Sequence, residues 1–204
     1  MAKGKRRSAC VILAAGRSSR MGSPKALLPV GPTTLLGWQT SSSRNIDLTV
    51  VVMPGDKPYP LDDRTGLVAV QNYQQELGPF HSVRLGLAAV IEQIGIPDVT
   101  FITPVDCPAE QKTYEDMLKP ELRSHFLVAT NGGTRGHPLA LSPQGVQLVL
   151  SAGVEENLRS LQNRDDISEI EVDSKLVCLN LNLPKDRAHL EALTSASTVG
   201  FGEC

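Results

Sequence analysis

The chain has 204 residues, of which 41% are hydrophobic and 21% charged, and 20 Lys and Arg against 22 Asp and Glu give it a net charge of −2. This is the composition of an ordinary globular protein that is large enough to bury a core, and it excludes a disordered chain, collagen and a coiled coil. No apolar run approaches the roughly 20 residues of a membrane-spanning helix, so we expect no membrane partner.

The charge is unevenly distributed. The first seven residues hold four of the basic side chains, Lys3, Lys5, Arg6 and Arg7, and the remainder of the chain has 16 basic residues against 22 acidic ones. A nucleic-acid-binding protein normally spreads its basic residues over a folded face, so we expect no nucleic-acid partner. We interpret residues 1–8 as a flexible basic tail, residues 9–194 as one domain and residues 195–204 as a C-terminal tail.

The cysteines do not form a recognisable framework. Cys10, Cys107, Cys178 and Cys204 include no C-x-x-C pair. Their spacing fits neither a zinc site nor a set of disulfides. We therefore expect a reduced, cytoplasmic protein.

Short apolar runs alternate with helical patterns in the first half of the chain. The runs are rich in Val and Ile and lack alternation, as strands buried on both faces do; they cover residues 9–13, 48–53, 67–70 and 99–103. Helices are expected between them at residues 33–43 and 82–94, where apolar side chains recur at helical spacing. Such alternation predicts βαβ units and a mostly parallel sheet.

The second half is less regular but continues the same architecture. Strands are expected at residues 126–129, 139–141, 170–172 and 176–179, and helices near 144–150, 155–161 and 184–193. No repeat or domain boundary interrupts the chain. The prediction is a single α/β domain.

The turn after the first strand has the composition of an anion-binding loop. Gly16 and Gly22 let backbone amides approach a ligand, while Arg17, Arg20 and Lys25 supply positive charge. The spacing matches neither the Walker loop nor the dinucleotide fingerprint. A polyphosphate site is one interpretation, and a solvent-exposed basic loop is the other.

A second candidate follows the strand at residues 99–103. Asp106, with Pro104 and Pro108 around it, lies where a carboxylate can hold Mg²⁺, which takes one or two carboxylates and leaves its other positions to water and phosphate. Alternatively, Asp106 caps a helix that starts near Pro108. Cys107 has no adjacent base and receives no catalytic role.

Three further segments carry polar residues at the ends of apolar runs. Asn72 can hydrogen-bond a base or ribose, and Ser82 is interpreted as a helix cap. His137, between Gly136 and Pro138, is either a residue near a pocket or a structural turn histidine. Near the end of the chain, Asn180 and Asn182 alternate with leucines, and Asn182 is a candidate helix cap.

Together these segments resemble the nucleotidyltransferases of the molybdenum-cofactor type (MobA/MocA-like). The string Leu-Ala-Ala-Gly-Arg-Ser-Ser-Arg-Met-Gly-Ser-Pro-Lys-Ala-Leu-Leu-Pro at residues 13–29 is similar to the opening signature of that family. The other matching segments follow in the family's order: Gly78-x-x-x-Ser82-Val83-Arg84, Pro104-Val105-Asp106-Cys107-Pro108, Gly136-His137-Pro138 and Asn180-Leu181-Asn182.

The resemblance implies a Rossmann-like, doubly wound domain with helices on both faces of a mostly parallel sheet. It places Leu13, Ala14, Ala15 and Gly16 against the nucleotide, Arg20 and Lys25 on its phosphates, and Asn72 near the base or ribose. Asp106 is expected to be the main Mg²⁺ ligand, and Asn182 a second polar ligand. Lys25, Arg20 and Asp106 are the expected catalytic residues.

The activity implied is transfer of a nucleoside monophosphate from an NTP to molybdopterin or its molybdenum-loaded form, with release of pyrophosphate. Ala15 favours CTP, because the GTP-using branch more often has Gly there; the Asn180-x-Asn182 ending favours GTP. Two departures affect the acceptor contacts and the second metal ligand: the cytidylyltransferase branch often has Asp at both Asn positions, and Val154 follows Gly153 where Asp is common. The alternatives are a guanylyltransferase acting on molybdopterin or another small phosphate, and a non-catalytic domain that binds a molybdoenzyme.

Overall fold

The computed structural model describes residues 6–16, 24–153, 155–164 and 166–182, with residues 186, 188 and 190. The strands are β1 (Ser8–Leu13), β2 (Pro29–Val30), β3 (Thr33–Thr34), β4 (Leu48–Pro54), β5 (Leu67–Asn72), β6 (Val99–Pro104), β7 (Phe126–Asn131), β8 (Thr134–Leu141) and β9 (Ile167–Glu171). The α-helices are α1 (Leu35–Ser42), α2 (Pro79–Ile94), α3 (Gln111–Leu118), α4 (Pro143–Ser151) and α5 (Leu158–Arg164). Short 3₁₀ helices are η1 (Lys25–Leu27), η2 (Gln75–Leu77) and η3 (Lys175–Cys178).

Seven strands form one sheet in the order β5-β4-β1-β6-β8-β7-β9. β1 pairs in parallel with both β4 and β6, β4 with β5, and β7 with β9. Only β8 runs the other way, antiparallel to β6 and β7, among the strands of this sheet. The mostly parallel sheet predicted from the sequence is confirmed, and β2 and β3 form a separate small hairpin.

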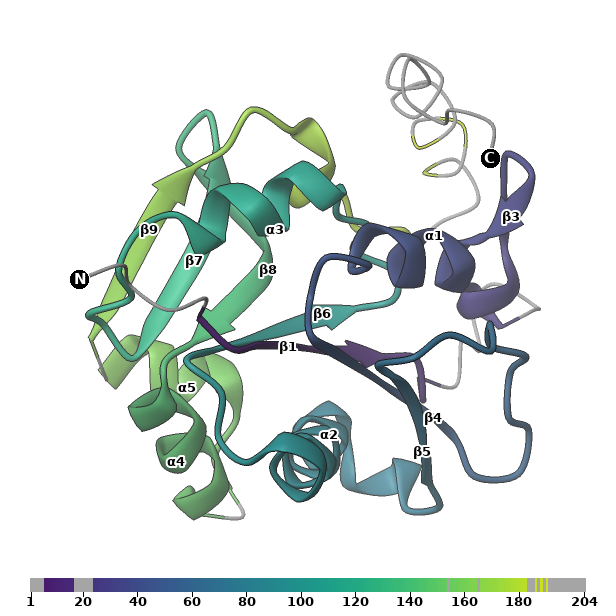
Figure 1. Cartoon of the computed structure of the whole chain (residues 1–204), viewed down its shortest axis with the longest axis horizontal. Coiled ribbons are helices and arrows are strands. Elements are labelled where there is room, and N and C mark those ends of the chain that lie inside the picture. The colour runs from purple at the N-terminus through teal and green to yellow at the C-terminus, as the bar shows by residue number, and fades with distance from the viewer. Residues whose placement is uncertain are drawn as a thin grey trace.

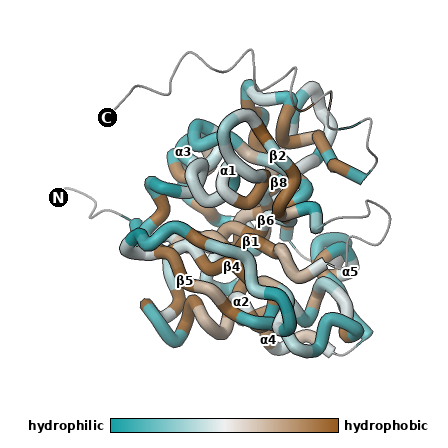
Figure 2. Tube along the Cα trace, turned by 90° about the vertical axis from the view of Figure 1, so that its right-hand side faces the viewer, coloured by the Kyte–Doolittle hydropathy of each residue, from teal (hydrophilic) through white to brown (hydrophobic). Residues whose placement is uncertain are grey.

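Helices cover both faces of the sheet (Figure 1): α1 and α3 lie on one face, and α2, α4 and α5 on the other. The two faces of β1 therefore contribute to two cores. Cys10 and Ile12 pack in the cluster that includes α1 and α3, and Ala9 and Val11 in the cluster that includes α2. Figure 2 shows hydrophobic residues along the strands. A strand enclosed in this way has no solvent-facing side, which explains why its sequence does not alternate.

Several predicted elements differ from those observed. Residues 176–179, expected to be a strand, lie instead in and just after the 3₁₀ helix η3. Helix α2 begins at Pro79, so Ser82 is inside the helix and the prediction that it caps the helix is wrong. Helix α5 starts at Leu158, later than expected. Of the last expected helix, Asp186, Ala188 and Leu190 are helical, and its other residues lie outside the described part.

Helix α3 was not predicted as a separate element. Its sequence is QKTYEDML, and only Thr113, Tyr114 and Met117 are buried. Three inward residues on an otherwise polar two-turn helix give a weak periodic signal. None of the helices in the described ranges is long and apolar enough to cross a membrane.

Candidate active site

The carboxyl ends of β1 and β6 lie side by side at a point where the chain changes direction across the sheet. From β1 the chain proceeds to β4 and β5 on one side and then returns to β6 on the other. The register pairs Leu13 with Pro104 at the ends of the two strands. Ligands in open α/β sheets bind at such a switch point, beyond the carboxyl ends of the strands. The loops after Leu13 and Pro104 therefore form the expected site.

The loop after β1 leaves one backbone segment open to ligand. The N–H of Ala14 donates to the carbonyl of Val52 at 2.8 Å, and the side chains of Ala14 and Ala15 are buried. Gly16 is exposed, and a Cβ built on it would meet nothing within 4 Å. The backbone of Gly16 is thus accessible to an anion. Arg17 to Ser23, including the expected phosphate ligand Arg20, lie outside the described residues.

The loop that carries Asp106 is fixed by contacts from three directions. The N–H of Val105 donates to the carbonyl of Leu13 at 3.0 Å, and the N–H of Leu181 donates to the carbonyl of Asp106 at 2.9 Å. From α1, the buried Gln39 donates its Nε2 to the carbonyl of Cys107 at 2.8 Å and to that of Pro104 at 3.2 Å. Gln39 therefore positions the residues on both sides of Asp106.

Sequence reasoning did not identify Gln39. The available signal was a polar residue on the inward face of a helix, and a buried amide needs partners. The alternative role of Asp106 as a helix cap is wrong, because α3 begins at Gln111 with Glu110 at its N-cap position. Its carboxylate is therefore not used to cap a helix.

Lys25, Asp106 and Asn182 meet although they are far apart in the sequence. The ammonium of Lys25 lies 2.6 Å from Oδ2 of Asp106 and donates to Oδ1 of Asn182 at 2.9 Å. The ion pair is mostly enclosed, with 15% of the Lys25 side chain and 21% of the Asp106 side chain exposed. All three residues were site candidates from the sequence, and the structure brings them into one cluster, here called the Lys25 cluster.

The oxygen atoms of the Lys25 cluster suit a hard divalent cation. A carboxylate oxygen and an amide oxygen converge on one positive charge, that of Lys25, and both are donor types that Mg²⁺ uses. Within the described ranges no group of three or more His, Cys, Asp or Glu side chains is arranged to hold a metal. The residues therefore fit an ion that receives its other ligands from water and phosphate.

Asn72 ends β5 and is completely buried. Its Nδ2 donates to the hydroxyl of Ser82 at 2.9 Å, and its Oδ1 accepts the N–H of Gln74 at 2.8 Å. These bonds connect the end of β5 to α2, which is the role of Ser82 that sequence reasoning missed. A contact between Asn72 and a base or ribose stays a prediction.

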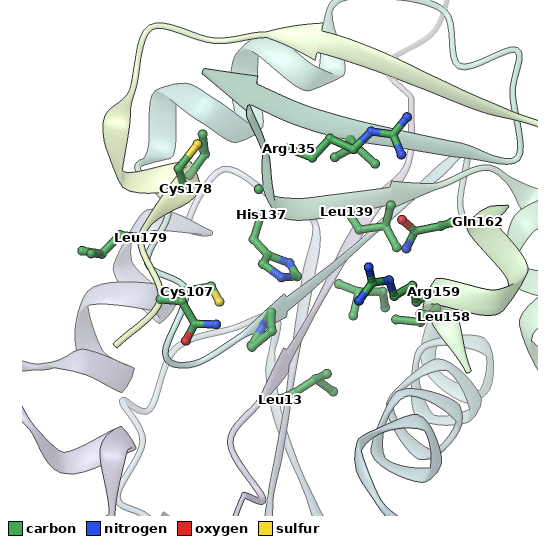
Figure 3. Close-up of a pocket in the computed structure, with 16 residues that line it drawn as sticks. Leu13, Cys107, Arg135, His137, Leu139, Leu158, Arg159, Gln162, Cys178 and Leu179 are labelled. Atoms are coloured by element: carbon green, nitrogen blue, oxygen red, sulfur yellow. The ribbon is translucent and has the colours of Figure 1, made fainter. Parts of the chain in front are cut away.

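A cavity of about 400 Å³ adjoins the Lys25 cluster. Leu13, Ile102, Val128 and Leu139 give it apolar walls, and Arg135, His137, Arg159 and Gln162 supply polar groups. In the view of Figure 3 the ring of His137 lies between Cys107 and Arg159. Cys107 and Asn180, close in sequence to Asp106 and Asn182, also line the cavity and link it to the cluster.

Two titratable groups of this cavity are held in their neutral forms. Burial lowers the pKa of His137, and the nearby charge of Asp106 opposes that shift. The imidazole is therefore neutral at pH 7, and its buried Nδ1 has no hydrogen-bond partner among the described residues. Burial raises the pKa of the Cys107 thiol, as does Asp106. Cys107 consequently remains a thiol, a poor nucleophile.

Gly136 allows η3 to close one wall of this cavity. A Cβ at Gly136 would lie 1.9 Å from the carbonyl oxygen of Val177, a backbone atom that cannot rotate away. We expect Gly136→Ala to lower the free energy of unfolding by about 1–3 kcal/mol, as other overpacking changes do. Thermal unfolding measures this, with Gly153→Ala as a control, since a Cβ at Gly153 would have its nearest contact at 3.8 Å. Equal melting temperatures for the two variants would contradict the packing described here.

Comparison with known proteins finds a matching family model and several relatives. A family model described as MobA-like NTP transferase domain matches residues 10–169. The molybdenum cofactor cytidylyltransferase of Escherichia coli is 22% identical over 181 residues, covering 87% of this chain and 92% of that protein. A protein of Pelotomaculum thermopropionicum named "probable molybdenum cofactor guanylyltransferase" is 27% identical over 206 residues, covering 93% and 95%.

Solved structures share the fold. The crystal structure of Rv0371c from Mycobacterium tuberculosis H37Rv in complex with manganese superposes with a TM-score of 0.70 at 24% sequence identity, covering 93% of this chain and 99% of that one. At this identity the likeness concerns the fold. The Rossmann-like α/β architecture expected from the sequence is confirmed.

Proposed function

Because the chain belongs to the family of the MobA-like NTP transferase domain, we propose that this nucleotidyltransferase acts in molybdenum cofactor biosynthesis. It transfers CMP from CTP to the terminal phosphate of molybdopterin or its molybdenum-loaded form, with Mg²⁺ as cofactor and pyrophosphate as the second product. The reaction takes place in the cytoplasm, and a molybdoenzyme receives the CMP-modified cofactor. The observation that carries this proposal is the Lys25 cluster at the switch point of the sheet, beside the open backbone of Gly16.

The chain's own residues provide alignment and charge. The acceptor phosphate is already a nucleophile, so the reaction needs no side-chain nucleophile or general base, in keeping with the neutral thiol of Cys107. Lys25 and the amide of Gly16 hold the triphosphate and stabilise the charge that develops on the departing pyrophosphate; each such donor lowers the activation barrier by about 3 kcal/mol. Mg²⁺, held by Asp106 and Asn182, supplies further neutralisation of the phosphates when bound.

The cavity beside the Lys25 cluster is the proposed acceptor site. Its apolar walls suit a flat ring system, and Arg159 provides positive charge for an anionic acceptor, whereas Arg135 is paired with Glu169 at 2.6 Å. Cys107 and Asn180, which line the cavity, are close in sequence to Asp106 and Asn182, and this supports an acceptor phosphate bound next to Asp106. The direction of attack is then from the cavity toward the nucleotide bound over the loop after β1.

His137 is proposed to orient the acceptor phosphate in this cavity. A neutral imidazole with an unpartnered nitrogen can donate one hydrogen bond to it. We expect His137→Gln to raise KM for molybdopterin about 3- to 10-fold, the value of one hydrogen bond, with an unchanged dissociation constant for CTP. Steady-state kinetics with each substrate varied in turn measures this. His125→Gln, at the amino end of β7, serves as the control; an equal effect of both variants would argue against the assigned role.

The choice of base rests on the loop after β1. Ala15 is similar to the CTP-using branch, and its side chain is 5% exposed in the core cluster beneath the loop. The Asn180-x-Asn182 ending and the guanylyltransferase relative favour GTP as the second candidate. We propose CTP because we expect the loop after β1 to lie closer to the base than the ending does.

Thermal unfolding with CTP, GTP, ATP and UTP, each with and without Mg²⁺, tests the proposed donor. A ligand at about 100 times its dissociation constant adds about 2.7 kcal/mol of stability, which shifts the melting temperature by several degrees in a protein of this size. We expect a magnesium-dependent shift with CTP. A shift with GTP alone would move the assignment to the guanylyltransferase, and no shift with any nucleotide would favour the non-catalytic domain.

A further inference from the structure

The ammonium of Lys25 contacts the two oxygen atoms that are proposed to bind the metal. Its Nζ lies 2.6 Å from Oδ2 of Asp106 and 2.9 Å from Oδ1 of Asn182, the two oxygens that fit a divalent cation. Mg²⁺ binds oxygen ligands at about 2.1 Å. An ion bound to the same two atoms would be only a few ångströms from the ammonium, with little water between them, because both side chains of the ion pair are mostly enclosed. Repulsion between two cations at that separation is strong.

We propose that Lys25 is an internal cation that closes the metal site of the nucleotide-free protein, and that the triphosphate opens it by drawing Lys25 away. This inference rests on the proposed function, and it adds an order of binding to it. The metal site is complete only when a nucleotide is bound. Without nucleotide, a divalent ion must compete with the Lys25 ammonium for the oxygens of Asp106 and Asn182.

The side chains involved allow this exchange. A lysine has a long flexible stem and three rotatable donors, so its ammonium can move while its backbone stays in place. In its present position it contacts the carboxylate of Asp106 and the neutral amide of Asn182, whereas a triphosphate over the neighbouring loop presents several anionic oxygens. The movement therefore leaves Lys25 with a stronger partner and leaves Asp106 with a free carboxylate.

The backbone around the site does not depend on Lys25. The N–H of Leu181 donates to the carbonyl of Asp106 at 2.9 Å, and the N–H of Asn182 donates to Oδ2 of Asp186 at 2.9 Å. Gln39 holds the other side of the Asp106 loop. Release of Lys25 consequently changes which cation the two oxygens hold, and it leaves the loop and the Asn180–Asn182 segment where they are.

Thermodynamic linkage makes the effect reciprocal. If Lys25 must leave before the metal binds, then removing Lys25 raises metal affinity in the absence of nucleotide. If the ion pair with Asp106 competes with the triphosphate for Lys25, then neutralising Asp106 raises the affinity for metal-free nucleotide. Coupling between two sites is typically about 5- to 150-fold. Both consequences can be measured as binding, without turnover.

The first test is Mn²⁺ binding to the nucleotide-free protein, followed by electron paramagnetic resonance of the free ion. We expect Lys25→Met to bind Mn²⁺ about tenfold or more tightly than the unaltered protein. Arg159→Gln removes the same charge from the adjoining cavity without touching Asp106, and it should give a much smaller gain. The double variant Lys25→Met with Asp106→Asn should lose the gain, which separates this site from surface carboxylates.

The second test is calorimetric binding of CTP in the presence of a chelator. We expect Asp106→Asn to bind metal-free CTP several-fold more tightly than the unaltered protein. Equal Mn²⁺ affinities with and without Lys25, or an equal gain from Arg159→Gln, would overturn the proposal. In that case magnesium-dependent transfer would still leave the proposed function standing. Absence of nucleotide binding in every variant would instead count against the proposed function itself.

Discussion

Replacing Asp106 with asparagine is expected to lower kcat by about 1,000-fold or more, the scale of losing the principal metal ligand and the charge it holds. The substitution keeps the size of the side chain, and the loop remains tied by its backbone bonds to Leu13, Leu181 and Gln39. The fold should therefore persist while the chemistry stops. Steady-state rates of pyrophosphate release, read beside a thermal unfolding curve, measure both.

A matched control is available on α3. Asp116 forms ion pairs with Lys112 at 2.7 Å and Lys119 at 2.6 Å on the surface of the protein. Asp116→Asn also removes a carboxylate that is paired with lysine, with two lysine partners where Asp106 has Lys25, and it lies away from the carboxyl ends of β1 and β6. It should leave kcat unchanged. Near-normal turnover of Asp106→Asn would contradict the assignment of the active site.

Replacing Lys25 with methionine is expected to lower kcat about 100- to 1,000-fold, because a donor aimed at developing phosphate charge is lost. The effect on the CTP dissociation constant should be smaller, since the same lysine is also held by Asp106 before nucleotide binds. Pre-steady-state release of pyrophosphate with CTP, Mg²⁺ and molybdopterin, at several CTP concentrations, separates these two quantities. A normal kcat with weakened CTP binding would restrict Lys25 to ground-state binding.

Lys25→Arg is the informative partner of this variant. Arginine retains the charge, so it should continue to exclude Mn²⁺ from the nucleotide-free site while recovering part of the activity. Lys25→Met should show the opposite pair of properties, stronger metal binding and lower activity. If Lys25 is an internal cation, Lys25→Met raises the affinity for Mn²⁺ and lowers the activity. If Lys25 forms only a structural ion pair, its loss should not raise the affinity for Mn²⁺.

The fold was predictable where the physical signal was strong. β1, β4 and β6 are enclosed on both faces, so their sequences are mostly apolar, with only Ser and Thr as polar residues among them, and do not alternate. The signal weakened where burial was partial. Helix α3 buries three side chains, and η3 buries Leu176 and Val177, an apolar pair too short to distinguish a strand from a 3₁₀ turn.

The residues of the Lys25 cluster could be picked out from the sequence, but their contacts could not. Lys25, Asp106 and Asn182 were identified by the motifs they belong to, and their meeting at one point follows from the order of the strands. Sequence could not show that Lys25 lies between the two proposed metal ligands, because that requires side-chain positions. It also could not show that Asn72 bonds to Ser82, or that Gln39 of α1 reaches the Asp106 loop.

The most direct test of the central claim follows the fate of the α-phosphate. The protein is incubated with Mg²⁺, molybdopterin and CTP radiolabelled in its α-phosphate, and the products are separated by chromatography. We predict that the label moves onto molybdopterin as CMP, with one pyrophosphate released per transfer, and that Asp106→Asn abolishes the movement. Label that remains in CTP, or that leaves only as free CMP with molybdopterin unchanged, would contradict the proposed transfer.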